Sequence, residues 1–278
     1  MFSETTIETT RAKPFLRWTG SKNWFIKEEC RRFIPARYNN YHEPFLGGGA
    51  VFFGLNQPNQ VFLNDLNWEL VNTYVQIRDN LELVISALKR YVNSREDYYR
   101  VREMQCRANY SKAAKFIYLN RTSFNGIYRV NWRGVYNVPY GKRPNVDIVT
   151  ENNLREVNKK LQKATLSSED FYNTLQHIQK GDLVYLDPPY TVAHEHNGFI
   201  EYNSKLFSWE DQLKLVEYIQ EVKRKKAFFI LSNAEHFEVR KLYHNIGKIV
   251  SLSRYCRVGG RNKTRGMYRE IIVTNSTI

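Results

Sequence analysis

Asp187, Pro188, Pro189 and Tyr190 form the stretch whose residue types and order suggest chemistry most directly. An exocyclic amino group on an aromatic base is a poor nucleophile, because its lone pair is delocalised into the ring. A carboxylate at position 187 and a fixed backbone carbonyl at position 188 could accept hydrogen bonds from the two N–H groups of this amine. Both bonds would favour a tetrahedral, nucleophilic nitrogen. The Tyr190 ring could stack on a base that has left a duplex, as base-modifying enzymes require. The alternative is a turn that ends a strand beside a core tyrosine.

The segment before this stretch predicts a buried strand that ends at Asp187. Residues 181–182 are a Gly-Asp turn pair, and the run after them is mostly apolar and β-prone. A short apolar run bounded by turn signals is typical of a buried strand. Because proline has no N–H, the two prolines end the strand and stiffen the chain beyond it. Asp187 is therefore expected at the carboxyl end of a sheet strand, where open α/β sheets bind their ligands.

A second strand-and-turn unit lies nearer the N-terminus. Residues 41–46 predict a strand, Gly47-Gly48-Gly49 predicts a tight turn into a helix, and residues 61–65 predict another strand. Glycines let the backbone approach a ligand closely. An acid at the end of the second strand, here Asp65, suits the ribose hydroxyls of a nucleoside cofactor. Asp65 could instead cap the helix that is expected from about Asn67.

Three ordered blocks carry a resemblance to a known family. The blocks are Phe15-Leu16-Arg17-Trp18-Thr19-Gly20-Ser21-Lys22, Glu43-Pro44-Phe45-Leu46-Gly47-Gly48-Gly49-Ala50-Val51-Phe52-Phe53 and Asp187-Pro188-Pro189-Tyr190. Together they resemble the Dam-type, alpha-group DNA adenine-N6 methyltransferases, and matching blocks extend from about Pro14 to Asn275. The resemblance implies direct methyl transfer from S-adenosylmethionine to N6 of a flipped adenine in duplex DNA, with S-adenosylhomocysteine as product and no metal. It also implies GATC as the first expectation for the target sequence.

The fold class implied by these elements is α/β, a Rossmann-like methyltransferase sheet with an inserted helical and β-hairpin DNA-recognition domain. We expect residues 1–66 and 165–278 to form a discontinuous catalytic domain and residues 67–164 to form the insertion. Strand-like runs flank Trp132-Arg133-Gly134 and predict a hairpin near residues 127–138 with its tip at these three residues. The sequence pattern also predicts a short strand over residues 164–166 and helices near residues 96–109, over residues 208–223 with a capping-box-like start, and over residues 234–243.

Residue roles can be carried over from the resemblance, position by position. It implies cofactor contacts at Trp18, Lys22, Glu43, Phe45, Gly47, Gly49, Asp65, Asp170, Phe171 and Asp187. A lysine can meet the methionine carboxylate of the cofactor, and a ring can cover its apolar parts. Asp170 and Phe171 would take the amino group of the cofactor's adenine and stack on its ring. They could equally mark a helix start with Ser168 as its cap, and Trp18 could belong to the core.

The DNA contacts are predicted on the inserted segment and on the first block. A guanidinium on a β-ribbon can read guanine O6 and N7 in the major groove. The resemblance implies that Phe124 and Asn125 fill the gap left by the extruded adenine and that Ile127 and Arg129 read bases. The remaining predicted DNA contacts are Arg17, which stands where the family has a base-contacting lysine, and Asn131, Arg133, Tyr140 and Lys142, of which Arg133 and Lys142 suit phosphates. The hairpin could instead only touch phosphates or pack on the helices.

Composition supports a polyanionic partner. The 278 residues carry a formal charge of +14 and include 19 tyrosines and 5 tryptophans among the Lys and Arg, which indicates a nucleic acid before a membrane. The resemblance implies that this nucleic acid is double-stranded DNA. The alternative is charge that serves solubility alone. Cys30, Cys106 and Cys256 form no C-x-x-C pair, which indicates reduced thiols in a cytosol. No apolar run has membrane-spanning length, and Met1–Thr10 does not resemble a signal peptide. We expect a cytoplasmic, DNA-associated monomer from a prokaryote or a phage.

Two loops and two rival functions stay open at this point. His194-Glu195-His196 lies in a polar loop without further ligands nearby, so a solvated or DNA-facing loop that could close over substrate is favoured over a metal site. The basic loop of residues 254–269 suggests phosphate contact or ordinary solvated charge. One rival is a methyltransferase acting on RNA or a protein amide. The other is a non-catalytic DNA-binding regulator.

Overall fold

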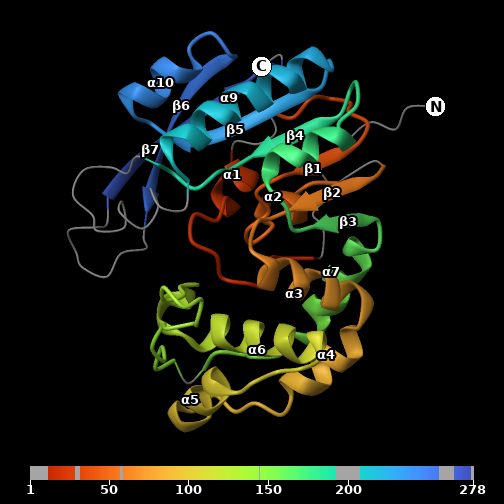
Figure 1. The fold of residues 1–278 in the computed structure, drawn as a ribbon, viewed down its shortest axis with the longest axis vertical. Helices are drawn as coiled ribbons and strands as arrows, with labels where there is room; N and C mark the ends of the chain where they lie inside the picture. The colour runs from red at the N-terminus through yellow and green to blue at the C-terminus, as the bar shows by residue number, and fades with distance from the viewer. Residues whose placement is uncertain are drawn as a thin grey trace. The chain divides into compact units, whose positions relative to one another are not determined.

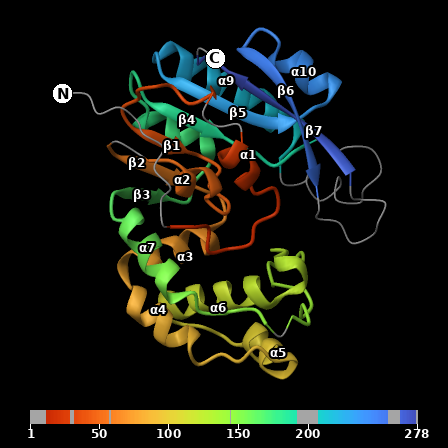
Figure 2. The same cartoon turned by 180° about the vertical axis from the view of Figure 1, so that it is seen from behind.

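The computed structural model describes residues 12–28, 32–56, 59–143, 145–191, 207–256 and 266–276. Its fold is α/β, as the sequence predicts, with a seven-stranded mixed sheet (Figures 1 and 2). The chain divides into two compact units. Unit 1 comprises Met1–Cys30 and Leu46–Glu169, and unit 2 comprises Arg31–Phe45 and Asp170–Ile278.

Unit 1 combines helices with two parallel strands. Its elements are α1 (Asn23–Glu28), α2 (Ala50–Gly54), β2 (Val61–Asn64), α3 (Trp68–Asp79), α4 (Leu81–Leu88), α5 (Arg95–Glu103), α6 (Asn109–Thr122), the 3-10 helix η2 (Phe124–Gly126), α7 (Glu151–Leu161) and β3 (Ala164–Ser167). Strands β2 and β3 pair in parallel, with Val61 opposite Ala164. Helix α6 packs against α3 and α4 (Figure 1). Side-chain caps start two helices, since Asn67 accepts the Leu70 N–H before α3 and Ser94 accepts the Asp97 N–H before α5.

A short hairpin comes after η2 in unit 1, with its tip where the sequence predicts it. Val130 and Tyr136 form an antiparallel bridge. The Asn131 N–H donates to the Val135 carbonyl at 2.8 Å, and Gly134 adopts φ 72° at the tip. The Asn131 side-chain oxygen also accepts the Val135 N–H at 3.0 Å, so a local side-chain bond closes the turn.

Unit 2 holds five strands in the order β1-β4-β5-β7-β6. Its elements are β1 (Tyr41–Glu43), the 3-10 helix η3 (Phe171–His177), β4 (Leu183–Leu186), α9 (Trp209–Arg224), β5 (Phe228–Ala234), α10 (Phe237–Tyr243), β6 (Lys248–Cys256) and β7 (Gly266–Thr274). Strands β1, β4 and β5 are parallel, and β7 runs antiparallel to both β5 and β6.

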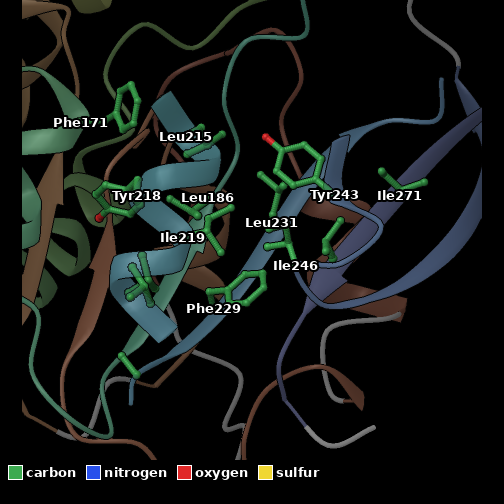
Figure 3. Close-up of a cluster of buried hydrophobic side chains, with 14 of the residues drawn as sticks. Phe171, Leu186, Leu215, Tyr218, Ile219, Phe229, Leu231, Tyr243, Ile246 and Ile271 are labelled. Atoms are coloured by element: carbon green, nitrogen blue, oxygen red, sulfur yellow. The ribbon is translucent and has the colours of Figure 1, made fainter. Parts of the chain in front are cut away.

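The core of unit 2 lies between α9 and the sheet (Figure 3). Leu215 and Ile219 of α9 are fully buried against sheet residues such as Leu231. Ser208 begins α9 with a capping box, because its hydroxyl accepts the Asp211 N–H while the Asp211 carboxylate accepts the Ser208 N–H. The helix and its cap agree with the sequence pattern.

Three predicted boundaries are wrong by several residues. The first strand ends at Glu43 rather than Leu46, because Pro44 follows it and has no N–H to donate to a neighbouring strand. The helix predicted over residues 96–109 ends at Glu103. The helix predicted from Ala234 begins at Phe237, since Ala234 still belongs to β5.

The compact units differ from the predicted domain division. Unit 1 includes β2 and β3 together with the inserted helices. Side chains of those helices reach this part of the chain: the Arg78 guanidinium donates to the Ala164 carbonyl at 2.7 Å, and the Lys160 ammonium donates to the Leu55 carbonyl at 2.6 Å. The division into catalytic and recognition domains stays a prediction. Among the described helices, none has the length and apolarity needed to cross a membrane.

Candidate active site

Asp187 directly follows β4, the strand between β1 and β5 in unit 2. All four residues of β4 are buried. Val184 stands opposite His42 of β1, and Leu186 stands opposite Leu231 of β5. Pro188 is buried, whereas Asp187 is only partly so. Asp187, a half-buried residue, thus lies just past the carboxyl end of a buried parallel strand, where the sequence predicted it.

Two buried groups hold the Tyr190 side chain. Its hydroxyl donates to Oε2 of Glu270 at 3.0 Å and lies 3.3 Å from Oγ of Ser232. Glu270 is 1% exposed and Ser232 is fully buried. Sequence reasoning missed both residues as part of the site. The available signal was a glutamate at the start of the otherwise apolar run of residues 270–273.

Further acidic and phenolic groups gather in the same unit. Glu43 is 2% exposed, and its Oε2 accepts the Tyr41 hydroxyl at 2.9 Å. Burial raises the pKa of Tyr185 far above its usual value, and the nearby ionisable groups of Asp187, Tyr190, Glu43 and Glu270 add to that shift. Three carboxyl groups thus lie near the Tyr185 hydroxyl at the end of β4, and such groups can accept hydrogen bonds from an amino donor.

Phe45 and Phe171 form part of an aromatic cluster in unit 2. Their ring centroids are 5.1 Å apart, and Phe171 is buried within the core (Figure 3). Nζ of Lys214 lies 5.4 Å from the centre of the Phe171 ring.

Asp170 has two structural partners. Its carboxylate accepts the Tyr172 N–H at 2.9 Å as the cap of η3, and Nζ of Lys214 lies 2.9 Å from it. The alternative cap, Ser168, is therefore wrong, because Asp170 fills that role. The Asp170 carboxylate is 45% exposed and could still accept a ligand's amino group.

In unit 1, Asp65 ties the glycine turn to the start of α3. Its Oδ2 accepts the Gly47 N–H at 2.9 Å, and its Oδ1 accepts the Asn67 N–H at 2.9 Å. Asn67, not Asp65, is the helix cap. Burial raises the pKa of the Asp65 carboxyl, and these two N–H groups oppose the shift. Each carboxylate oxygen of Asp65 keeps a lone pair that could accept a hydrogen bond from a hydroxyl group.

Trp18 covers the glycine turn. A Cβ on Gly47 would lie 2.8 Å from Cδ1 of Trp18, and one on Gly48 would lie 2.8 Å from Cβ of Trp18. The tryptophan ring also stacks on Tyr128, with centroids 5.6 Å apart. Lys22 is 3% exposed, and its ammonium donates to the Gly20 carbonyl at 3.1 Å. Gly49 adopts φ 65° just before α2, a conformation that favours glycine.

Three predicted DNA-contacting residues come together in unit 1. Asn120 binds both the N–H and the carbonyl of Arg17, at 2.8 and 2.7 Å. The Arg17 side chain lies against Gly126, where a Cβ would be 2.4 Å from Cδ of Arg17. The two residues before Gly126 are exposed, and Phe124 presents 48% of its surface. Asn125 also has a left-handed backbone conformation, with φ 55°.

The hairpin residues fall into two groups. Arg129 is exposed, and its Nε donates to Oδ1 of Asn137 across the hairpin at 2.9 Å, while the Arg133 guanidinium lies 4.5 Å from the centre of the exposed Trp132 ring. Ile127 is half-buried and Lys142 is exposed. By contrast, the Asn131 oxygen closes the hairpin tip. The Tyr140 hydroxyl donates to Oδ1 of Asn93 at 3.0 Å, so these two side chains already have structural partners.

Two predicted loops lie outside the described residues. These are His194-Glu195-His196 and most of the basic loop, residues 257–265. Within the described ranges, no cluster of three or more His, Cys, Asp or Glu side chains could hold a metal ion.

Comparison with known proteins gives a consistent result. The family model of the D12 class N6 adenine-specific DNA methyltransferases matches residues 18–255. Type II methyltransferase M1.LlaDCHI of Lactococcus lactis subsp. cremoris is 36% identical over 275 residues, which cover 95% of each chain. Type II methyltransferase M.MjaIII of Methanocaldococcus jannaschii is 32% identical over 288 residues, covering 95% of this chain and 99% of that one. The DNA adenine methylase of Haemophilus influenzae is 30% identical over 240 residues, covering 84% and 83%.

Proposed function

The chain belongs to the D12 class of N6 adenine-specific DNA methyltransferases, and from this premise we propose how its residues carry out the reaction. The Asp187 carboxylate and the Pro188 carbonyl accept the two N–H bonds of the adenine amino group, and the Tyr190 ring stacks on the extruded base. Pro189 keeps the segment rigid. The observation that carries this proposal is a half-buried aspartate directly after a buried strand, three residues before a tyrosine whose hydroxyl is held by Glu270.

The reaction needs placement more than acid–base strength. Accepting hydrogen bonds from both N–H groups withdraws the amino lone pair from the ring and directs it at an incoming methyl group. The methylated nitrogen then gives up one proton, which the Asp187 carboxylate or water accepts. Because β4 is buried and two prolines come soon after it, the Asp187 carboxylate and the Pro188 carbonyl need little reorganisation. Such preorganised polar groups and alignment supply most of the acceleration in reactions of this kind.

We propose S-adenosylmethionine as the cofactor, whose sulfonium supplies the methyl group and its own leaving group when bound. The donor chemistry of the chain fits it. The Asp65 carboxylate is fixed by two N–H groups and suits ribose hydroxyls, and acids gather where a sulfonium would be favoured. In unit 1 we assign to the cofactor Trp18, Lys22, Gly47, Gly49 and Asp65. In unit 2 we assign to it Glu43, Phe45, Asp170, Phe171 and Asp187.

We propose that the substrate is duplex DNA with the sequence GATC. Phe124 and Asn125 support the site of the extruded adenine, with Arg17 against the same segment. Ile127 and Arg129 read bases, and Arg133 and Lys142 contact phosphates. Asn131 and Tyr140 contribute through the hairpin geometry that their hydrogen bonds maintain. We further propose a cytoplasmic monomer of prokaryotic or phage origin.

Sequencing of methylated adenines tests the substrate. The chain is expressed in a host that lacks adenine methylation, and an Asp187→Ala variant serves as the control. We expect N6-methyladenine in GATC for the wild-type chain and none for the variant. Methylation confined to another sequence would contradict the GATC assignment and leave adenine methylation intact.

A further inference from the structure

We propose that Glu270 is a positioning residue for methyl transfer, whose buried carboxylate fixes the Tyr190 ring and supplies negative charge beside the target base. The inference rests on the proposed stacking role of Tyr190. Glu270 itself belongs to β7, the last strand in chain order, and lies 80 residues from Tyr190 along the chain.

Sheet topology brings this glutamate to the reactive edge of unit 2. Strand β7 is antiparallel to β5, so its earlier residues lie beside the carboxyl end of β5, with Glu270 opposite Ala234. Strand β4 is parallel to β5 and in register with it, with Leu186 opposite Leu231. The carboxyl end of β4, next to Asp187, therefore lies near the residues of β5 that face the start of β7.

The contacts around Glu270 are specific. Its Oε2 accepts the Tyr190 hydroxyl at 3.0 Å and lies 3.4 Å from the Ser232 hydroxyl. Only 1% of its surface is exposed. Burying a carboxylate is costly, and an apolar residue of similar volume is often as good or better for stability. A carboxylate at this position is therefore better explained by what it does to Tyr190 than by its contribution to folding.

The bond has two consequences for the reaction. It holds the phenol ring in one orientation, so that the ring's face is preorganised for stacking. It also draws electron density from the carboxylate onto the phenol, and an electron-rich ring attracts positive charge. The adenine amino nitrogen gains positive charge as the methyl group arrives. Glu270 should therefore stabilise the transition state more than the bound substrate, and its loss should lower kcat rather than raise KM.

A double-mutant cycle tests this inference. Single-turnover methyl transfer is measured on a duplex with one target site for Glu270→Gln, Tyr190→Phe and the combined variant. We expect each single variant to lose about 10-fold or more in rate, with DNA affinity unchanged, and the combined variant to lose no more than the worse single one. With 2-aminopurine at the target position, fluorescence should be higher in Glu270→Gln, because a less ordered Tyr190 quenches the flipped base less.

A matched control lies on the same strand. The Thr274 hydroxyl of β7 is buried and donates to the Phe229 carbonyl at 2.7 Å. Thr274→Val should reduce thermal stability yet keep kcat and the 2-aminopurine signal. This separates loss of a buried hydrogen bond on β7 from loss of the contact with Tyr190.

The outcomes distinguish the two proposals. Wild-type kcat in Glu270→Gln, with Tyr190→Ala impaired, would overturn the role of Glu270 alone. Wild-type kcat in Tyr190→Ala would overturn the stacking role on which it rests. Additive losses in the combined variant would also contradict the inference. If Glu270→Gln does not fold, Tyr190→Phe still decides, since it removes only the hydroxyl, and full activity in that variant would refute the proposal.

Discussion

At the residue scale, Trp18 fills the space that the missing side chains of Gly47 and Gly48 leave open. Sequence reasoning assigned glycine there to close approach of a ligand, yet the nearest group is the protein's own Trp18 side chain, through the indole at Gly47 and through Cβ at Gly48. The same ring stacks on Tyr128, which immediately precedes Arg129 of the hairpin. Trp18 thus links the glycine turn to the segment proposed to read DNA, all within unit 1.

Gly47→Ala should displace Trp18. The new Cβ would lie 2.8 Å from the indole, and Gly47 adopts φ 50°. We expect the Kd for S-adenosylmethionine to rise about 10-fold or more and unfolding to become easier by about 1–3 kcal/mol. Isothermal titration calorimetry and urea unfolding measure the two effects.

Gly134→Ala is the matched control for Gly47→Ala. Gly134 adopts φ 72°, but its Cβ would meet nothing within 4 Å. It should therefore show the backbone strain of about 1 kcal/mol without a change in cofactor affinity. Equal cofactor affinity in the two variants would show that the indole does not matter for the cofactor.

At the scale of elements, the two arginines of the hairpin should have different effects on DNA binding. The Arg129 guanidinium is held by Asn137, whereas that of Arg133 lies over Trp132. Arg129→Ala should reduce discrimination at one base pair by about 1–3 kcal/mol. Arg133→Ala should weaken binding to all sequences alike and lower the salt dependence by about one phosphate contact. Competition binding with single-base variants of the target distinguishes them, and identical profiles would argue against separate roles.

Deprotonation of Tyr136 in the hairpin should lower the free energy of unfolding at alkaline pH. Its hydroxyl donates to the Ile127 carbonyl at 2.8 Å, and burial raises the pKa of Tyr136 from 10.0 to about 12. The pKa is higher in the folded state, so this contribution to stability is complete below about pH 10 and is lost as pH rises towards about 12. Tyr136→Phe should make the fall of the unfolding free energy over this pH range less steep by the contribution of one tyrosine, because other buried tyrosines such as Tyr98 and Tyr118 also have raised pKa values. An unchanged profile would contradict the prediction.

The sequence predicts those helices and strands whose limits are marked by nearby residues. Strands β2, β3 and β4 are short apolar runs bounded by turns, and α9 begins with a capping box, so all four were predicted within a few residues. The end of β1 was placed three residues too late, although Pro44, which cannot donate to a ladder, marks it locally. Glu270 was missed because its partner Tyr190 is distant in sequence and only strand register brings them together.

For the whole molecule, charge should govern DNA affinity. The chain carries 42 Lys and Arg against 28 Asp and Glu, a net charge of +14. Each phosphate contact adds about −0.9 to the slope of log K against log salt. We expect affinity for duplex DNA to fall on the order of 10³-fold between about 50 and 200 mM salt, for target and non-target sequences alike. Fluorescence anisotropy measures this, and a flat dependence would exclude a basic surface as the source of affinity.

The central claim is that the Asp187 carboxylate directs the amino group of a flipped adenine. Asp187→Ala removes that acceptor and leaves the hairpin untouched. The decisive measurement is the single-turnover rate of methyl transfer to a target duplex, taken at saturating DNA and S-adenosylmethionine. We predict a loss on the order of 10² to 10³-fold or more with DNA affinity within about 2-fold of wild type. A variant that transfers methyl at the wild-type rate would contradict the claim.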